Sequence, residues 1–290
     1  MRNLFAEPEV EVTIYGDECA KERLKEFSDR DFPVFINPSS IKGLFVMRPP
    51  AGAVVSHRGI VLSVFGDYRD QQNRKLQNFF IRKQMILPEG KLEREYSQEF
   101  SFDNLKLPTA TYYGSMINAI FGIEVRTIHR LTDHLFEKQF IVLSYSPVPQ
   151  PVPIHNEVGM RNIIHIEFVF PKDTYNFREC VVGTTCFILV KLRIVKFSME
   201  LYRHEFFHSN LTDFNHKTLL KEYEFMDGSP VKGDNIPFRI YLGEHDIWPY
   251  AHFAGSELRV EHYLRAKMVD ENGKHYYKRM KIKIDRLAQE

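Results

Sequence analysis

Apolar residues recur at every second position through most of this 290-residue chain, and this period constrains the fold more than any other feature. Its clearest instance is the face made of Leu258, Val260, His262, Leu264, Ala266 and Met268. Because successive side chains of a β-strand point to opposite sides, the pattern predicts strands with one buried face. About seven such segments fall in each half, without a sustained helical period, so we expect an all-β protein of two antiparallel β-sandwiches in tandem.

The alternation, together with intervening Gly and Pro residues, bounds the expected strands. We place them at residues 10–14, 32–36, 42–48, 54–66, 96–102, 116–128, 138–145, 162–170, 178–190, 191–207, 218–226, 234–242, 257–269 and 275–285. Residues 16–31 are polar and charged and predict a long loop. Residues 70–84 fit a helix face or a pair of strands, and their strand-rich surroundings favour strands. A phase shift near Ile194 indicates a β-bulge, and Asn272-Gly273 predicts a hairpin turn.

Four alternating prolines mark the best boundary between the two halves. The segment 146–154 reads SPVPQPVPI, with proline at every second position from 147 to 153. Proline cannot donate a ladder hydrogen bond and favours extended geometry, so this segment is a stiff linker or an edge. A chain of this length exceeds one ordinary domain. We therefore expect one domain at 1–150 and a second at 151–290.

Charge and cysteine content narrow the class of protein. The formal net charge is +1, which gives no bulk attraction to nucleic acid or to a membrane surface. The three cysteines are Cys19, Cys180 and Cys186; the last two lie about 20 Å apart if their segment is extended, too far for a disulfide. We expect reduced thiols in a cytosolic protein. The N-terminus lacks an apolar signal region, so membrane association would come through partners.

One catalytic motif is present, but its context argues against catalysis. Residues 204–208 read H-E-x-x-H, which holds zinc when a helix places both imidazoles on one face. Here the motif ends a predicted strand, where His204 and His208 would lie about 13 Å apart. His165, inside an apolar strand, is interpreted as a hydrogen-bonded core histidine. We expect no enzyme activity, cofactor or metal; a zinc hydrolase using His204 and His208 is the alternative.

Residues 223–242, YEFMDGSPVKGDNIPFRIYL, predict a strand, a turn and a second strand. Alternation places Phe225 on one face with Leu219 and Tyr223. It places Met226 on the other face with the neighbouring glutamates, directly before an Asp227-Gly228 turn. Two interpretations remain open on phase alone. Either a neighbouring loop covers Met226, or Phe225 and Met226 are anchors for another protein.

Several long runs resemble the vacuolar protein sorting 26 family, the arrestin-fold subunit of the retromer coat. These runs are HRGIVLSVFG (57–66), TYYG (111–114), HRLTDHLFEKQFIV (129–142), EVGMRNIIHIEFVF (157–170), CVVGTTCFILVKLRIVKFSMEL (180–201), YEFMDGSPVKGDNIPFRIYL (223–242) and VEHYLRAKMVDENGKHYYK (260–278). The resemblance implies two arrestin-like sandwiches joined through a polar interdomain core, and no enzymatic activity. Residues 16–52 depart from the family pattern.

The resemblance also implies partners and a location. In that family the second domain docks the vacuolar protein sorting 35 subunit, and the matching residues here are Phe225, Met226, Asp227 and Gly228. A sorting nexin and the tails of transmembrane cargo are further expected partners, with the membrane reached only through the complex. The expected location is cytoplasmic, peripheral on endosomes, with cargo sent to the trans-Golgi network or plasma membrane. Alternatives are an arrestin-like adaptor for receptor tails and a subunit of a paralogous endosomal recycling complex.

Overall fold

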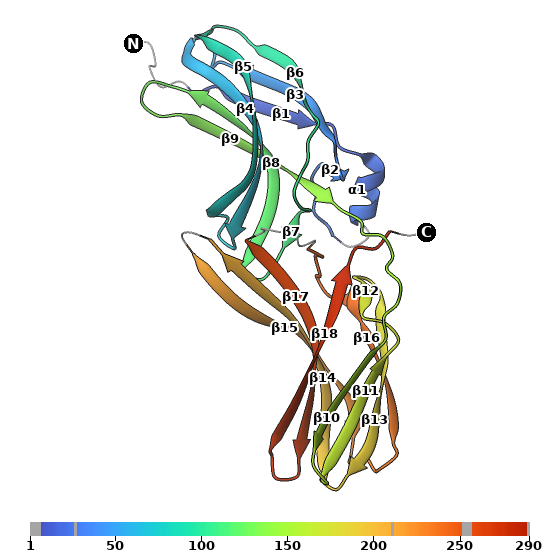
Figure 1. The fold of residues 1–290 in the computed structure, drawn as a ribbon. Helices are drawn as coiled ribbons and strands as arrows, with labels where there is room; N and C mark the ends of the chain where they lie inside the picture. Colours follow the sequence, from blue (N-terminus) through green and yellow to red (C-terminus); the bar gives the residue numbers. More distant parts are fainter. Residues whose placement is uncertain (1–6, 26–27, 210–211, 251–256, 289–290) are drawn as a thin grey trace. The chain divides into compact units, whose positions relative to one another are not determined.

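The computed structural model describes residues 7–25, 28–209, 212–250 and 257–288. The fold is nearly all β, as predicted (Figure 1). The chain divides into two compact units. The first comprises residues 1–113 and 117–144, and the second comprises residues 114–116 and 145–290. No helix in the described ranges is long and apolar enough to span a bilayer.

The first unit is built from two sheets. One has the strand order β1-β3-β6, and the other has the order β2-β9-β8-β4-β5 with β7 also paired to β8. Their bounds are β1 (Glu9–Ile14), β2 (Val34–Ile36), β3 (Ser40–Arg48), β4 (Val55–Asp70), β5 (Lys75–Leu92), β6 (Tyr96–Asp103), β7 (Tyr112–Tyr113), β8 (Ile117–Ile128) and β9 (His134–Leu143). Buried residues from both sheets, among them Phe45, Phe100, Leu62 and Phe121, form one hydrophobic core. This is the packing expected of a β-sandwich.

The second unit also has two sheets, with orders β10-β11-β13-β16 and β12-β18-β17-β14-β15 (Figure 1). The bounds are β10 (Ile154–Met160), β11 (Ile164–Phe170), β12 (Thr174–Asn176), β13 (Cys180–Val190), β14 (Ile194–His208), β15 (Asp213–Asp227), β16 (Asn235–Tyr241), β17 (Leu258–Asp270) and β18 (His275–Asp285). The rings of Phe187 on β13 and Phe197 on β14 meet edge to face, with centroids 6.1 Å apart. Both side chains are fully buried, so this pair joins the two sheets.

Three local predictions are confirmed. The strand assignment within residues 70–84 is correct, but residues 75–92 form one continuous strand, β5, paired with β4, in place of a pair of strands. The ladder between β14 and β17 shifts register between Ile194 and Lys196, so Val195 is the extra residue of a β-bulge. The β17–β18 hairpin turns at Asn272-Gly273, where Gly273 has φ +76°, a conformation that glycine adopts without steric cost.

The predicted loop at 16–31 is wrong, because it contains the helix α1 (Glu18–Lys25). The Asp17 carboxylate accepts a hydrogen bond from the backbone N–H of Ala20 at 3.2 Å, which satisfies one of the free donors of the first turn. Ala20 and Leu24 are the buried residues of this helix. Two apolar positions one turn apart are too short a pattern to reveal a helix from sequence.

Candidate partner-binding site

The segment expected to bind a partner ends an edge strand. In the described part of the second unit, β15 is the outermost strand of its sheet and pairs with β14. Residues 228–234 then connect β15 to β16, which belongs to the other sheet. Such a position leaves one side of the strand and its following loop accessible to another molecule.

The register of β14 and β15 corrects the predicted orientation of Met226. Tyr223 lies opposite Met199 and Glu224 lies opposite Ser198, but Met226 lies opposite Phe197. Phe225 is therefore the extra residue of a β-bulge. Since residues directly opposite each other share a face, the bulge puts Met226 on the same side of the sheet as the buried Phe197. The predicted placement of Met226 with the glutamates is wrong.

A second bulge in β15 corrects the predicted position of Leu219. The register shifts again between Leu201 and Tyr202, so that Leu219 lies opposite Tyr202 and on the face away from Tyr223. Leu219 is 44% exposed. The expected shared face is therefore wrong for Leu219, because a bulge reverses the alternation that follows it. It is correct for Tyr223 and Phe225, whose rings are stacked with centroids 6.2 Å apart.

Phe225 packs against aromatic rings of both sheets. Its ring centroid lies 5.5 Å from that of Phe238 on β16, 6.5 Å from Phe197 and 6.2 Å from Tyr223. Phe225 and Met226 are both half-buried. Part of each side chain thus supports the core of the second unit and part remains available for contact.

Gly228 opens the loop in a conformation that other residues rarely adopt. Its φ is +112°, and nothing lies within 4 Å of the position that a Cβ would occupy. Glycine is required there by backbone conformation and not by lack of space. The backbone of Asp227 ends β15, while its side chain lies outside the described part of the structure.

The far end of the loop is anchored to β13. Gly233 donates its N–H to the Phe187 carbonyl at 2.7 Å, and Phe187 donates back to the Asp234 carbonyl at 2.9 Å. The Asp234 carboxylate accepts from the Val231 N–H at 2.8 Å. Val231 itself is 63% exposed. The loop is thus held by its backbone while presenting an apolar side chain to solvent.

The H-E-x-x-H residues lie on β14, as predicted, and each has its own partner. His204 is buried and its Nε2 contacts the side-chain oxygen of Asn215. Burial lowers the pKa of His204. The Glu205 carboxylate accepts the backbone N–H of Ser115 at 3.1 and 3.2 Å. His208 is exposed and pairs with Asp213 at 2.7 Å. A strand separates the imidazoles and directs Glu205 to the opposite face.

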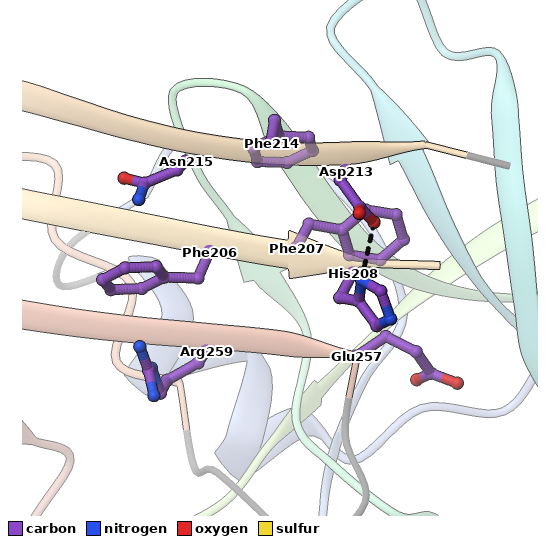
Figure 2. A pocket seen from close by; sticks show the side chains of 8 residues that line it. All are labelled: Phe206, Phe207, His208, Asp213, Phe214, Asn215, Glu257 and Arg259. Atoms are coloured by element: carbon purple, nitrogen blue, oxygen red, sulfur yellow. Dashed lines mark ion pairs between the residues drawn. The ribbon is translucent and has the colours of Figure 1, made fainter. Parts of the chain in front are cut away.

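A pocket of about 550 Å³ surrounds the end of this motif (Figure 2). Its lining residues are Phe206, Phe207, His208, Asp213, Phe214, Asn215, Glu257 and Arg259. The Arg259 guanidinium lies 4.1 Å from the centre of the Phe206 ring, and the His208–Asp213 ion pair stands at one side. These eight residues include no serine, cysteine, threonine or lysine. Among the described lining residues, the His208–Asp213 pair therefore has no hydroxyl, thiol or amine nucleophile to activate.

Sequence reasoning missed a buried polar group in the second unit. His262 falls on the apolar face of β17, and burial, assisted by the charge of Arg203, lowers its pKa to about 3. Arg203 is buried as well, and its guanidinium donates to the Ser115 hydroxyl. Alternation alone cannot reveal this group, because it marks which face is buried and not which polar residues meet there.

The other polar residues predicted from sequence differ in outcome. His165 is hydrogen-bonded, as predicted, but lies on the outer face of β11 with its side chain 39% exposed, so its assignment to the core is wrong.

Cys19, Cys180 and Cys186 are free thiols. Burial, with the nearby charge of Glu167, raises the pKa of the Cys186 thiol, which makes it a poorer nucleophile.

Comparison with known proteins identifies the family. The family model described as "Vacuolar protein sorting-associated protein 26" matches residues 7–273. The chain belongs to this family. The sequence resemblance is thereby confirmed, and membership supports a role in vacuolar protein sorting.

Curated relatives cover most of the chain. The Caenorhabditis elegans vacuolar protein sorting-associated protein 26 is 27% identical over 97% of this chain and 80% of its own length. The Arabidopsis thaliana protein 26A is 29% identical over 89% and 86%, respectively. The Schizosaccharomyces pombe protein is 23% identical over 99% and 98%. All three are named for sorting and not for a catalysed reaction.

Proposed function

We propose that this protein is a non-catalytic subunit of the retromer endosomal coat. The observation that carries the proposal is the family match over residues 7–273, which spans strands of both units. The subunit binds vacuolar protein sorting 35 and helps to sort transmembrane cargo from endosomes to the trans-Golgi network or the plasma membrane. It acts in the cytoplasm on the endosomal surface, and reaches the membrane through the complex, with a sorting nexin and cargo tails as further partners.

The docking segment for vacuolar protein sorting 35 is Phe225, Met226, Asp227 and Gly228. The bulge at Phe225 supports this assignment, because it brings two large apolar side chains to one side of β15. Both remain half-buried in the free chain, and the Phe225 ring is supported by Phe197 and Phe238. A side chain already held by its neighbours loses little conformational entropy on binding, which favours its use as an anchor.

A co-purification experiment tests the proposal. Vacuolar protein sorting 35 is used to capture the wild-type chain and the double variant Phe225→Asp/Met226→Asn. Each lost anchor weakens binding by about 2 kcal/mol, and the introduced charge adds a desolvation cost, so the double variant should no longer be captured.

The matched control is Leu219→Asp, which places a charge at an exposed apolar position of the same strand. This control should be captured like the wild type. Circular dichroism shows whether each variant is folded. A folded double variant captured as well as the wild type would place the docking site elsewhere.

A further inference from the structure

The outer face of the four-stranded sheet carries a group of residues that we call the carboxylate–histidine cluster: His155 and Glu157 on β10, and His165 and Glu167 on β11. The register puts Glu157 directly opposite Glu167 and His165 opposite Gly159. Ile164, Ile166 and Phe168, which alternate with the cluster residues on β11, are buried in the sandwich core. The four cluster side chains therefore all point away from that core, on one surface.

The ligand atoms of the cluster are spaced as a metal site requires. The His165 Nε2 atom lies 3.1 Å from a Glu157 oxygen and 3.6 Å from a Glu167 oxygen. One ligand atom each from Glu157, His165 and Glu167 fall within 4.8 Å of one another. In a tetrahedral zinc site with bonds of about 2.0–2.2 Å, neighbouring ligand atoms are separated by about 3.3–3.6 Å. The two nitrogen–oxygen separations are close to those values, and the ligand oxygens of Glu157 and Glu167 lie within 4.8 Å of each other.

A second imidazole nitrogen lies beside the other oxygen of Glu167. The His155 Nε2 atom lies 3.1 Å from Glu167 Oε2, while His165 is nearer to Oε1. Glu167 thus stands between two imidazoles. His155 is not one of the residues whose ligand atoms all lie within 4.8 Å of one another, so it orients Glu167 and leaves the fourth position on zinc open to water.

The charges of the cluster favour a cation. Glu157 and Glu167 are directly opposed across the ladder, an arrangement that destabilises a pair of strands when both carboxylates are ionised. A neutral imidazole has a single N–H, so Nε2 of His165 can donate to only one of the two carboxylates at a time. A divalent cation bound to both carboxylates and to the imidazole nitrogen would neutralise the pair completely.

The backbone leaves room for this approach. Gly159, opposite His165, has no side chain, so the imidazole can lean diagonally across the ladder toward Glu157. A Cβ at position 159 would lie 3.0 Å from the Ile164 carbonyl oxygen, which is a tight contact. The opening beside His165 is therefore a property of this glycine.

We propose that the carboxylate–histidine cluster binds a divalent metal ion of the zinc class, with Glu157, His165 and Glu167 as ligands, water in the fourth position, and His155 orienting Glu167. Imidazole nitrogen combined with carboxylate oxygen suits Zn²⁺, whereas Mg²⁺ and Ca²⁺ prefer all-oxygen sites. The proposal rests on the outer face of β10 and β11 and is independent of the docking segment.

Calorimetric titration of the 290-residue chain with Zn²⁺ tests the site. We expect one zinc per chain, and no comparable heat with Mg²⁺ or Ca²⁺. His165→Ala and Glu157→Gln should each weaken zinc binding at least about tenfold, by loss of one ligand. The matched control is His208→Ala, which removes an exposed imidazole that is also paired with a carboxylate but lies on β14. This control should bind zinc like the wild type.

A melting curve without metal completes the test. The Glu157 side chain is 70% exposed, so Glu157→Gln should fold, and it should melt at or slightly above the wild-type temperature because like-charge repulsion is relieved. If His165→Ala fails to fold, Glu157→Gln alone decides. The proposal is overturned if the wild type shows no zinc binding, if folded Glu157→Gln binds as tightly as the wild type, or if His208→Ala loses binding equally.

Discussion

Met226 lies directly opposite the buried Phe197 across the β14–β15 ladder. Strict alternation along β15 from Tyr223 would instead have placed the Met226 side chain on the other face of the sheet. The bulge at Phe225 accounts for this position. Two neighbouring apolar side chains consequently share one side of an edge strand, half-buried beside a loop. The same two residues support the core and form the proposed docking segment, so their effects on stability and on binding must be measured separately.

Because Met226 is half-buried, we expect its replacement by Asn to lower the free energy of unfolding moderately. Met226→Asn should destabilise the protein by about 1–2 kcal/mol, less than the loss of a fully buried methionine. For a protein of this size the melting temperature should fall by roughly 2–8 °C. Leu219→Asn, at an exposed position on the same strand, should change it by less than about 2 °C. Equal melting temperatures for Met226→Asn and wild type would show that Met226 makes no contact with the core in solution.

Gly228 provides a test of the loop conformation. Gly228→Ala should destabilise the protein by about 1–3 kcal/mol, because φ +112° is unfavourable for any residue with a Cβ. The open space around the added methyl group excludes a clash as the cause. Chemical denaturation measures the change, and Ser229→Ala, at the next residue of the loop, serves as control. If Gly228→Ala leaves the free energy of unfolding unchanged, the loop adopts another backbone conformation.

Buried His262 predicts a loss of stability in mild acid. Its pKa is lowered to about 3 in the folded protein, so the unfolded chain binds the extra proton when the pH falls below about 6.5. The contribution of His262 to the free energy of unfolding is fully present above that pH and is lost as the pH falls below it. Between pH 7 and 5 the loss amounts to about 2 kcal/mol. His262→Gln should have a flatter dependence of melting temperature on pH, and an unchanged slope would contradict the assignment.

The H-E-x-x-H motif should be inert. We expect the double variant His204→Ala/His208→Ala to bind zinc as the wild type does and to show the same absence of peptide hydrolysis. The strand geometry of β14 and the separate partners of the two imidazoles give the reason. Stoichiometric zinc that disappears in this double variant would restore the hydrolase alternative.

The sequence predicts the fold class well because the alternation is local. The clean face from Leu258 to Met268 and the Asn272-Gly273 turn each lie within one segment, and both are found in the structure. The bulge at Val195 was predictable because a run of apolar residues changes phase there. The bulge at Phe225 was not, because its flanking residues do not reveal a phase change and only pairing with β14 does.

Clusters of residues that are far apart in the sequence cannot be predicted from local alternation. Glu157 and Glu167 are ten positions apart, and only the β10–β11 register brings their carboxylates together. His262 was predicted on the correct face, but its proximity to Arg203 depends on the β14–β17 ladder. For the docking segment, the sequence supplied the residues through family resemblance. The structure then corrected how Met226 is oriented.

Calorimetric titration of vacuolar protein sorting 35 with the 290-residue chain tests the docking segment most directly. We predict submicromolar binding for the wild type and for Leu219→Asp. For folded Phe225→Asp/Met226→Asn it predicts weakening by about 4 kcal/mol, roughly a thousandfold. If that folded double variant binds within about threefold of the wild type, the docking segment is not where the partner binds.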